Sequence, residues 1–414
     1  MALPPRPDGR QRLPEAPAPP VDSLTDDVLA SILIRLPTLA DLGRAAAACP
    51  TFRRVIADPA FLRRVRALHP ALLLGFLTST GGFRPAEPPY PSVPAARAVA
   101  RAADFSYSFL PAPSGWAVRD ARDGRVLLDR NDGGDGTFAR LAVCDPLFRR
   151  YVVLPPIPED LAAAVQQPHL LDRDRKSEVF LVPSDLEAAA AAPQTSFRVV
   201  WMAQCPTKLV TFIFSSDSGQ WDAVASPTWN DLDPAKSRVT MASRLLYFRS
   251  YAYGCFYWMM MSITPSFLVL DMARMEFSLL NYPSDFSGQA SVIAEAGEGR
   301  LGMFSFNAKF GESFELDIFS TVRPIQGEGA SKWQTMRGAM LPHQYRYQIL
   351  GVVNSQLLVQ GDLEFLDEDF LPPHVEILQI ALNTDYGSVC GMIDEALHPV
   401  PLLGYPPSLS SPSI

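Results

Sequence analysis

Two groups of acidic residues have the spacing best suited to catalysis in this sequence. They are Glu312, Glu315 and Asp317, and, further along the chain, Asp362, Glu364, Asp367, Glu368 and Asp369. Two carboxylates that converge on one pocket, one as acid and one as base or nucleophile, can hydrolyse a glycosidic bond. Glu315 and Asp317, however, alternate with apolar residues as the solvent face of a strand does, and the second group is typical of a charged loop. We therefore predict that no residue is catalytic.

Other reaction chemistries lack their usual signatures. The sequence contains no G-x-S-x-G, no phosphate-binding glycine loop and no H-E-x-x-H. The five cysteines lie far apart in the sequence, and no two of them are close together. They are Cys49, Cys144, Cys205, Cys255 and Cys390. The histidines are equally scattered, so we expect neither a disulfide framework, a metal site nor a cofactor.

The charge and hydropathy of the 414-residue chain disfavour two classes of partner, nucleic acids and membranes. Its net charge of −8 and isoelectric point near 5.2 disfavour binding to nucleic acid. The first residues contain no apolar signal-peptide core, so we expect a cytoplasmic or nuclear protein. The uncharged run from 250 to 270 is long enough for a membrane span, but its aromatic residues and the break at Thr264–Ser266 favour a buried hairpin. We predict no membrane partner.

A short helical segment stands out between Leu24 and Pro70. Apolar residues recur at helical spacing after Asp26, and Pro37 ends this first helix. Further helices are predicted around residues 42–49, around 52–56 and after Asp58, which is expected to cap the last of them. These helices carry more apolar surface than so short a segment can bury by itself. The surplus predicts a binding partner.

The same residues resemble the F-box family. The matching positions are Leu24, Val28, Leu29, Ile32, Leu33, Leu36, Pro37, Leu42, Arg44, Cys49, Arg53, Ile56, Asp58, Pro59 and Phe61. Thr25 departs from the usual proline, and Phe52 from the usual tryptophan. The resemblance implies a small three-helix F-box that binds a Skp-type adaptor and, through it, the cullin of an SCF ubiquitin ligase. The implied adaptor-binding residues are Leu24, Val28, Leu29, Ile32, Leu33, Leu36, Pro37, Leu42, Cys49, Phe52 and Ile56, although some of them must serve the internal core.

Two rival interpretations of the helical segment remain open. The helices could pack only against the rest of the chain, with no partner. They could also form a DNA-reading helix-turn-helix, because seven arginines face four aspartates between residues 23 and 70. This excess of positive charge is weak for a nucleic-acid binder.

Beyond residue 100 the pattern changes to short apolar runs separated by Gly, Pro, Asp and Asn, which is typical of many strands. The runs 143–158 and 269–283 share a scheme of strand, acidic turn, strand and closing proline, in which Asp145 and Asp271 can accept backbone hydrogen bonds. At about 40 to 50 residues for each unit, this region would form a β-propeller of about six to eight blades.

The expected organisation is therefore an α+β multidomain chain. Residues 1–22 are predicted to be a disordered proline-rich arm, 23–70 the F-box, 71–99 a linker, 100–395 the propeller-like domain and 396–414 a disordered tail. The runs CDPLFRRYVVLPPIP, GCFYW, FLVLDMARMEFSLLNYP and GEGRLGMF also resemble the C-terminal domain of plant F-box proteins, and the richness in Ala, Arg and Pro is similar to that of grass members.

These resemblances imply a substrate-recognition subunit for ubiquitin-dependent protein degradation, whose β domain binds an as yet unknown protein. Two alternatives stay open: a propeller enzyme such as a glycoside hydrolase, and a binding scaffold outside any ligase. The acidic residues Asp367, Glu368 and Asp369 would attract a basic segment of a partner.

Overall fold

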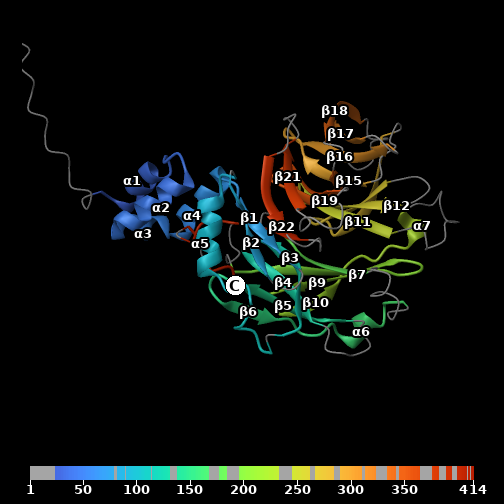
Figure 1. Cartoon of the computed structure of the whole chain (residues 1–414). Coiled ribbons are helices and arrows are strands. Elements are labelled where there is room, and N and C mark those ends of the chain that lie inside the picture. Colours follow the sequence, from blue (N-terminus) through green and yellow to red (C-terminus); the bar gives the residue numbers. More distant parts are fainter. Residues whose placement is uncertain are drawn as a thin grey trace, which may run out of the picture. The chain divides into compact units, whose positions relative to one another are not determined.

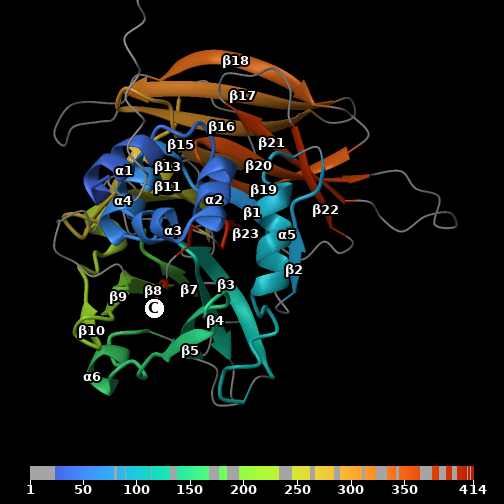
Figure 2. The same cartoon turned by 90° about the vertical axis from the view of Figure 1, so that its left-hand side faces the viewer.

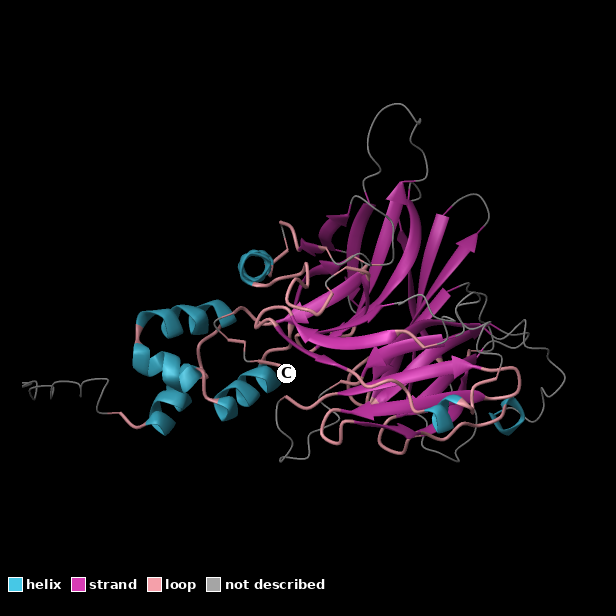
Figure 3. Cartoon of the chain, turned by 90° about the horizontal axis from the view of Figure 1, so that it is seen from below, coloured by secondary structure: helices cyan, strands magenta, loops and turns pink. Residues whose placement is uncertain are grey.

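A computed structural model describes residues 24–414 apart from 79–81, 89, 113, 131–137, 167–176, 184–194, 233–244, 262–265, 284–289, 310–312, 323–332, 342–344, 364–374, 382–387, 394–398, 408 and 411. The predicted arm over 1–22 lies outside these residues. The chain divides into two compact units, Met1–Pro70 and Ala71–Ile414. Among the described residues the first unit contains helices only, whereas strands dominate the second (Figure 3).

The described part of the first unit, residues 24–70, contains four helices. They are α1 (Asp26–Leu33), α2 (Leu39–Ala48), α3 (Pro50–Ile56) and α4 (Pro59–Leu68). The three-helix description is thus corrected by α4, the helix expected after Asp58. The Asp58 side chain accepts from the backbone N–H groups of Ala60 and Phe61 at 2.9 and 3.0 Å, which confirms it as a cap. Thr25 precedes α1, but its side chain makes no capping hydrogen bond.

The second unit contains five four-stranded antiparallel sheets that follow one another along the chain (Figure 1). The first two are β3 (Trp116–Arg122), β4 (Arg125–Arg130), β5 (Arg140–Asp145) and β6 (Arg150–Val153), then β7 (Ser177–Leu181), β8 (Arg198–Gln204), β9 (Leu209–Ser215) and β10 (Gln220–Ala223). The third is β11 (Leu245–Ala252), β12 (Cys255–Met261), β13 (Ser266–Asp271) and β14 (Glu276–Asn281). The last two are β15 (Ala290–Glu295), β16 (Arg300–Lys309), β17 (Ser313–Val322) and β18 (Gln334–Leu341), then β19 (Tyr345–Val353), β20 (Gln356–Leu363), β21 (Val375–Ala381) and β22 (Ser388–Ile393).

Equivalent turns recur from sheet to sheet. Asp145 accepts from the N–H groups of Leu147 and Phe148, and Asp271 accepts from those of Ala273 and Arg274, which confirms the two predicted acidic turns. The residue four positions after each aspartate has a positive φ; these residues are Arg149 and Met275. In the second sheet Gly219 also has a positive φ and, like them, directly precedes the last strand of its sheet. The two strands of each predicted unit, β5–β6 and β13–β14, are indeed antiparallel neighbours.

The first two strands of four sheets are joined by tight hairpin turns. In the fourth sheet the turn has three residues with positive φ, at 297–299. In the other three sheets two consecutive residues with positive φ form the turn, at 123–124, 253–254 and 354–355. Two left-handed residues in succession define the type I′ turn, whose twist matches that of antiparallel strands. The uncharged run over 250–270 forms one such hairpin and its neighbouring strand, β11, β12 and β13, as predicted.

Hydrophobic clusters fill the spaces between neighbouring sheets. Val143 and Trp201 belong to a cluster between the first and second sheets, and Phe256 joins a cluster between the second and third. Met303 and Leu357 belong to the corresponding clusters further round the unit. Each sheet thus buries both faces against its neighbours, which is how propeller blades are stabilised. The arrangement is a five-bladed β-propeller.

The expected six to eight blades are therefore not found. The estimate of 40 to 50 residues for each blade was too small, because the first strands of the first three blades begin at residues 116, 177 and 245, so the first two blades each take more than 60 residues of the chain. The sixth sheet has only three strands, β1 (Leu72–Leu77), β2 (Phe83–Pro85) and β23 (Val400–Gly404). It packs through Leu402 against the first blade and through Leu73 against the fifth.

This three-stranded sheet also corrects two predicted boundaries. Residues 71–99 were expected to be a linker, but they contain β1, β2 and much of α5 (Val93–Ala102), whose Ala96 is fully buried. Residues 396–414 were expected to be a disordered tail, but β23 pairs with β1 in an antiparallel register (Figure 2). Proline enrichment misled the prediction, because it cannot reveal pairing between strands more than 300 residues apart in sequence.

Candidate functional site

The first candidate site is the surface of α1. Leu29 and Leu33 lie on its inner side and are 2% and 4% exposed, whereas Val28 and Ile32 are 44% and 53% exposed. Leu24 and Leu36, which extend the same four-residue spacing, are half-buried. Because residues four apart share one side of a helix, Val28 and Ile32 form an exposed apolar row on α1, here called the α1 stripe, and Leu24 and Leu36 lie just beyond the two ends of the helix.

The structure divides the predicted adaptor-binding residues into two sets. Leu29, Leu33, Leu42 and Ile56 are buried in the interior of the unit. The others remain accessible: Leu24, Val28, Ile32, Leu36, Pro37, Cys49 and Phe52 are half-buried or exposed. The sequence could not separate these sets, because both have the same apolar residue types.

Polar contacts hold the helices of the first unit in place. The Arg53 Nε donates to the backbone carbonyl of Ala46 at 3.0 Å, which joins α3 to α2. Arg54 pairs with Asp26 through both of its terminal nitrogens, one of them at 2.8 Å, which joins α3 to α1. The exposed pair contributes little free energy but fixes the orientation of α1.

The second candidate site is a cavity of about 1280 Å³ within the propeller. Strands that are first in their blade, β3, β7, β11 and β19, line it together with β23. Ligand pockets commonly have volumes of about 300–1,000 Å³, so the cavity has room for more than a drug-sized molecule.

Irregular pairing shapes three of the lining strands. The register shifts at Arg119 in β3, at Phe248 and Arg249 in β11, and at Leu350 in β19. Each shift is a β-bulge that places an extra residue opposite its partner strand, and all four of these residues line the cavity. Bulges redirect side chains and are frequent beside functional sites.

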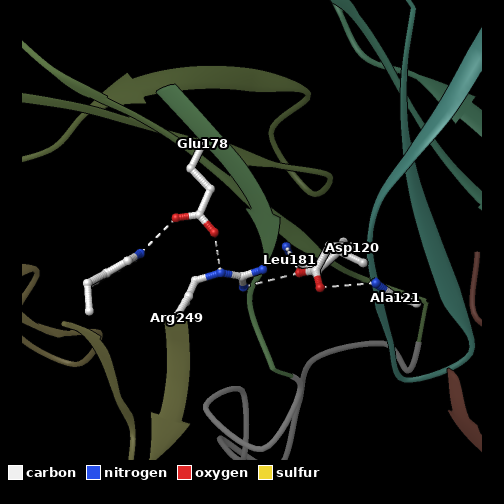
Figure 4. A network of polar contacts seen from close by, with 6 residues as sticks. Asp120, Ala121, Glu178, Leu181 and Arg249 are labelled. Carbon is white, nitrogen blue, oxygen red and sulfur yellow. Dashed lines mark hydrogen bonds and ion pairs between the residues drawn. The ribbon is translucent and has the colours of Figure 1, made fainter. Parts of the chain in front are cut away.

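A polar network crosses the cavity wall between three blades (Figure 4). Arg249 donates from Nε to the Glu178 carboxylate at 2.7 Å and from Nη1 to the Asp120 carboxylate at 3.3 Å. Asp120 also accepts from the N–H groups of Leu181 and Ala121 at 2.8 and 3.0 Å. The second oxygen of Glu178 accepts from the Trp258 indole at 2.7 Å, so both carboxylates are fully engaged.

Burial and charge act in opposite directions on this network. Burial raises the pKa of Asp120, but the Arg249 and Arg122 guanidinium groups and the bond from Leu181 outweigh it and hold that pKa below its usual value. Burial alone would lower the pKa of Arg249, but the negative charges of Asp120 and Glu178 outweigh burial, so this pKa lies above its usual value. Asp120 therefore stays ionised and is a poor general acid.

Two buried polar atoms of residues beside the cavity have no hydrogen-bond partner among the described residues. They are Nε of Arg122 and Oε1 of Gln204, whose residue is only 5% exposed. The Arg122 guanidinium lies over the Tyr251 ring, 5.5 Å from its centre. Buried polar atoms normally have hydrogen-bond partners, so these two are exceptions in the wall of the cavity.

Of the acids considered for catalysis in the sequence, those that the structure describes do not line this cavity. Glu315 and Asp317 lie on β17 and Asp362 lies on β20, neither of which is a lining strand. The other acids, Glu312, Glu364, Asp367, Glu368 and Asp369, lie outside the described residues. The sequence did not predict Asp120, Glu178 and Arg249 as site residues. Glu178 and Arg249 are each the one charged residue of their strand, whereas Asp120 lies between two arginines in β3. Nothing in one sequence shows that these three strands meet.

The cysteines that the structure describes form no disulfide bonds. Cys49, Cys144, Cys205 and Cys255 are free thiols, and burial raises the pKa of Cys144 and of Cys205. Within the described ranges no three metal-binding side chains gather, and no helix there has the length and apolar character needed to cross a membrane.

The chain is similar to known proteins in structure but not in sequence. No protein-family profile and no curated protein sequence matches the chain. The chain is similar to the β-propeller domain of the Trilobed protease from Pyrococcus furiosus, with 9% identity and a TM-score of 0.33 over 68% of this chain and 72% of that one. It is similar to the fucose-specific lectin from Aleuria aurantia, with 10% identity and a TM-score of 0.35 over 68% and 79%. It is also similar to TolB from Acinetobacter baumannii, with 8% identity and a TM-score of 0.32 over 72% and 59%.

Proposed function

We propose that this protein is the substrate-recognition subunit of an SCF-type ubiquitin ligase. The proposal is carried by the α1 stripe, whose Val28 and Ile32 project from a helix that already buries Leu29 and Leu33. The unit thus has a complete interior and a second apolar row left over. This row belongs to the segment whose sequence resembles an F-box, so its occupant is a Skp-type adaptor.

The accessible apolar residues form the contact in this proposal. Leu24, Val28, Ile32, Leu36, Pro37, Cys49 and Phe52 face the adaptor, whereas Leu29, Leu33, Leu42 and Ile56 support the helices from inside. The cullin joins through the adaptor, and the propeller presents a protein substrate. The subunit itself performs no chemistry, in the cytoplasm or the nucleus.

The two carboxylates of the Arg249 network are poorly suited to a propeller glycosidase. A glycosidase needs one carboxyl group with a raised pKa, yet Asp120 has a lowered pKa and Glu178 is bonded at both oxygens. A scaffold outside any ligase is the remaining alternative, and it would recover neither adaptor nor cullin.

Affinity purification followed by mass spectrometry tests the proposal. The tagged full chain is compared with the double variant Val28→Asp/Ile32→Asp, which adds charge to the α1 stripe without touching the interior. We expect the wild type to recover a Skp-type adaptor and a cullin. Losing central apolar contacts costs about 2 kcal/mol or more, so recovery by the variant should fall roughly thirtyfold.

The matched control is Leu68→Asp, because Leu68 is an apolar residue of the same unit that is 61% exposed and lies outside the α1 stripe. This control should recover both proteins at the wild-type level. Equal recovery by the double variant would remove the α1 stripe as the contact, and absence of adaptor from the wild-type sample would reject the ligase role.

A further inference from the structure

Arg119 lines the cavity and is held there by a carboxylate of its own blade. Its Nε donates to Asp129 at 2.6 Å. The Asp129 side chain is only 12% exposed, whereas the Arg119 side chain is 50% exposed. Among the described residues, the two terminal nitrogens of Arg119 have no hydrogen-bond partner. The guanidinium is therefore fixed on one side and open on the other.

Strand alternation places this pair on the face of the first blade that is turned toward the second blade. In β4, Leu127 belongs to the hydrophobic cluster between the two blades, and Asp129 follows two residues later. Residues two apart in a strand lie on the same face. Leu141, which pairs with Asp129 from β5, belongs to the same cluster. The Arg119 guanidinium, which is bonded to Asp129, therefore lies beside the space between the first two blades.

One hydrogen bond joins the inner strands of these two blades. Asp120, the residue after Arg119, accepts from the Leu181 N–H at 2.8 Å, which connects β3 to β7 (Figure 4). Val179 lies two residues before Leu181, packs against the same cluster and lines the cavity. Arg119 and Val179 therefore lie near one another on neighbouring inner strands.

Apolar side chains accompany Val179 in this part of the cavity. Trp201 pairs with Val179 from the adjacent strand, and the centres of the Phe138 and Trp201 rings are 5.0 Å apart. All three residues line the cavity, and Val179 and Phe138 are only half-buried. An apolar wall beside a few fixed polar groups is typical of small-ligand sites. The open guanidinium and an apolar wall are thus next to each other.

The shape and the charge of the Arg119 group select the ligand. A guanidinium fork forms its strongest hydrogen bonds with a carboxylate or a phosphate. Asp129 already offsets the charge of Arg119, so a second negative charge on the ligand would be repelled rather than paired. A carboxylate with one charge therefore fits better than inorganic phosphate. The neighbouring apolar wall stabilises a ligand whose carboxylate carries an apolar group.

We propose that the propeller cavity binds a carboxylate that carries an apolar group, with the carboxylate on the terminal nitrogens of Arg119 and the apolar group against Val179 and Phe138. Two kinds of molecule have this chemistry, a free organic acid and the C-terminal end of a polypeptide. The inference goes beyond the proposed function and requires neither adaptor nor cullin.

Saturation-transfer NMR with the full chain tests this inference. The probe is hydrocinnamate, and its matched partners are hydrocinnamamide, which lacks the charge, and acetate, which lacks the apolar group. We expect hydrocinnamate to bind with a dissociation constant of about 1 mM or lower, and both partners to bind at least about tenfold more weakly. Equal binding of hydrocinnamamide would overturn the inference, as would no binding of hydrocinnamate up to about 10 mM.

Competition identifies the class and the source of the ligand. Inorganic phosphate at equal concentration should leave hydrocinnamate bound, and displacement would contradict the preference for one carboxylate. A glycine-rich tetrapeptide that ends in a phenylalanine carboxylate distinguishes the two sources. Displacement by less peptide than hydrocinnamate assigns the site to a polypeptide end, and displacement only by more peptide assigns it to a free acid. Equal displacement by the C-terminal amide of this peptide would contradict both.

Variants connect the binding to the named residues. Arg119→Gln should remove the preference for hydrocinnamate over its amide, and Arg119→Lys, which keeps the charge without the fork, should weaken binding at least about threefold. Phe138→Ala should weaken hydrocinnamate binding but leave acetate binding unchanged. The matched control is Arg101→Gln, because Arg101 is exposed on α5 outside the cavity, and it should bind like the wild type. A preference that survives Arg119→Gln would reject the assigned site.

Discussion

Arg249 joins three blades through two carboxylates. Asp120 comes from β3, Glu178 from β7 and Arg249 from β11, so the contact links strands that are distant in sequence. Such a buried pair adds little net stability, because desolvation offsets most of the attraction. Removing one partner, however, leaves an uncompensated buried charge. The network therefore acts mainly by fixing the relative positions of the first three blades around the cavity.

At this residue scale we predict a pH-dependent effect of Asp120→Asn. The folded pKa of Asp120 lies below its ordinary value of 3.8, so its contribution is present above about pH 4 and is lost as the pH falls through the folded pKa. At pH 7 the variant should lose about 3 kcal/mol of unfolding free energy. The difference from the wild type should shrink as the pH falls below about 4.

Thermal unfolding between neutral and strongly acidic pH measures this effect, with Asp222→Asn as the control. Asp222 is exposed on β10, and its variant should follow the wild type at every pH. A difference between Asp120→Asn and the wild type that stays constant through the acidic range would contradict the assigned role of the charge.

Two strands, β1 and β19, each have a glycine beside a bulge. Gly75 in β1 and Gly351 in β19 both lie beside register shifts and both have φ near +150°. A side chain at Gly75 would meet the Arg84 carbonyl at 2.1 Å, whereas nothing lies within 4 Å of a side chain at Gly351. The two positions therefore have the same backbone conformation, but only Gly351 has room for a side chain.

At the element scale this pair gives a matched comparison. We expect Gly351→Ala to cost about 1 kcal/mol from the backbone alone. Gly75→Ala should cost at least about 2 kcal/mol more, because β2 must move away from β1. Denaturant unfolding of the full chain checks both values. Equal losses would show that the close approach of β1 and β2 does not constrain the three-stranded sheet.

Sequence patterns predicted most elements, because their signals are local. Asp145 and Asp271 mark turns through bonds to residues two and three positions ahead, and Asp58 caps α4 in the same way. The three-stranded sheet was missed because β1 and β23 are far apart in sequence. The cavity network was missed for the same reason, since nothing near Arg249 in sequence indicates Asp120 or Glu178.

At the scale of the whole molecule, the proposed function uses two separate surfaces. The first unit has an exposed apolar row that its own interior does not use, and the second has a cavity within the propeller. Each surface is built from residues of one unit only, so each should function when the other is altered. This independence is what a subunit that connects a substrate to a ligase requires.

Direct titration of the full chain with a purified Skp-type adaptor tests the central claim most directly. Calorimetry should show saturable binding of one adaptor to one chain, with a dissociation constant of about 1 μM or lower, which corresponds to about 8 kcal/mol. Val28→Asp/Ile32→Asp should weaken this binding at least roughly thirtyfold. No heat of binding with the wild type, at adaptor concentrations up to about 100 μM, would contradict the assignment as a ligase subunit.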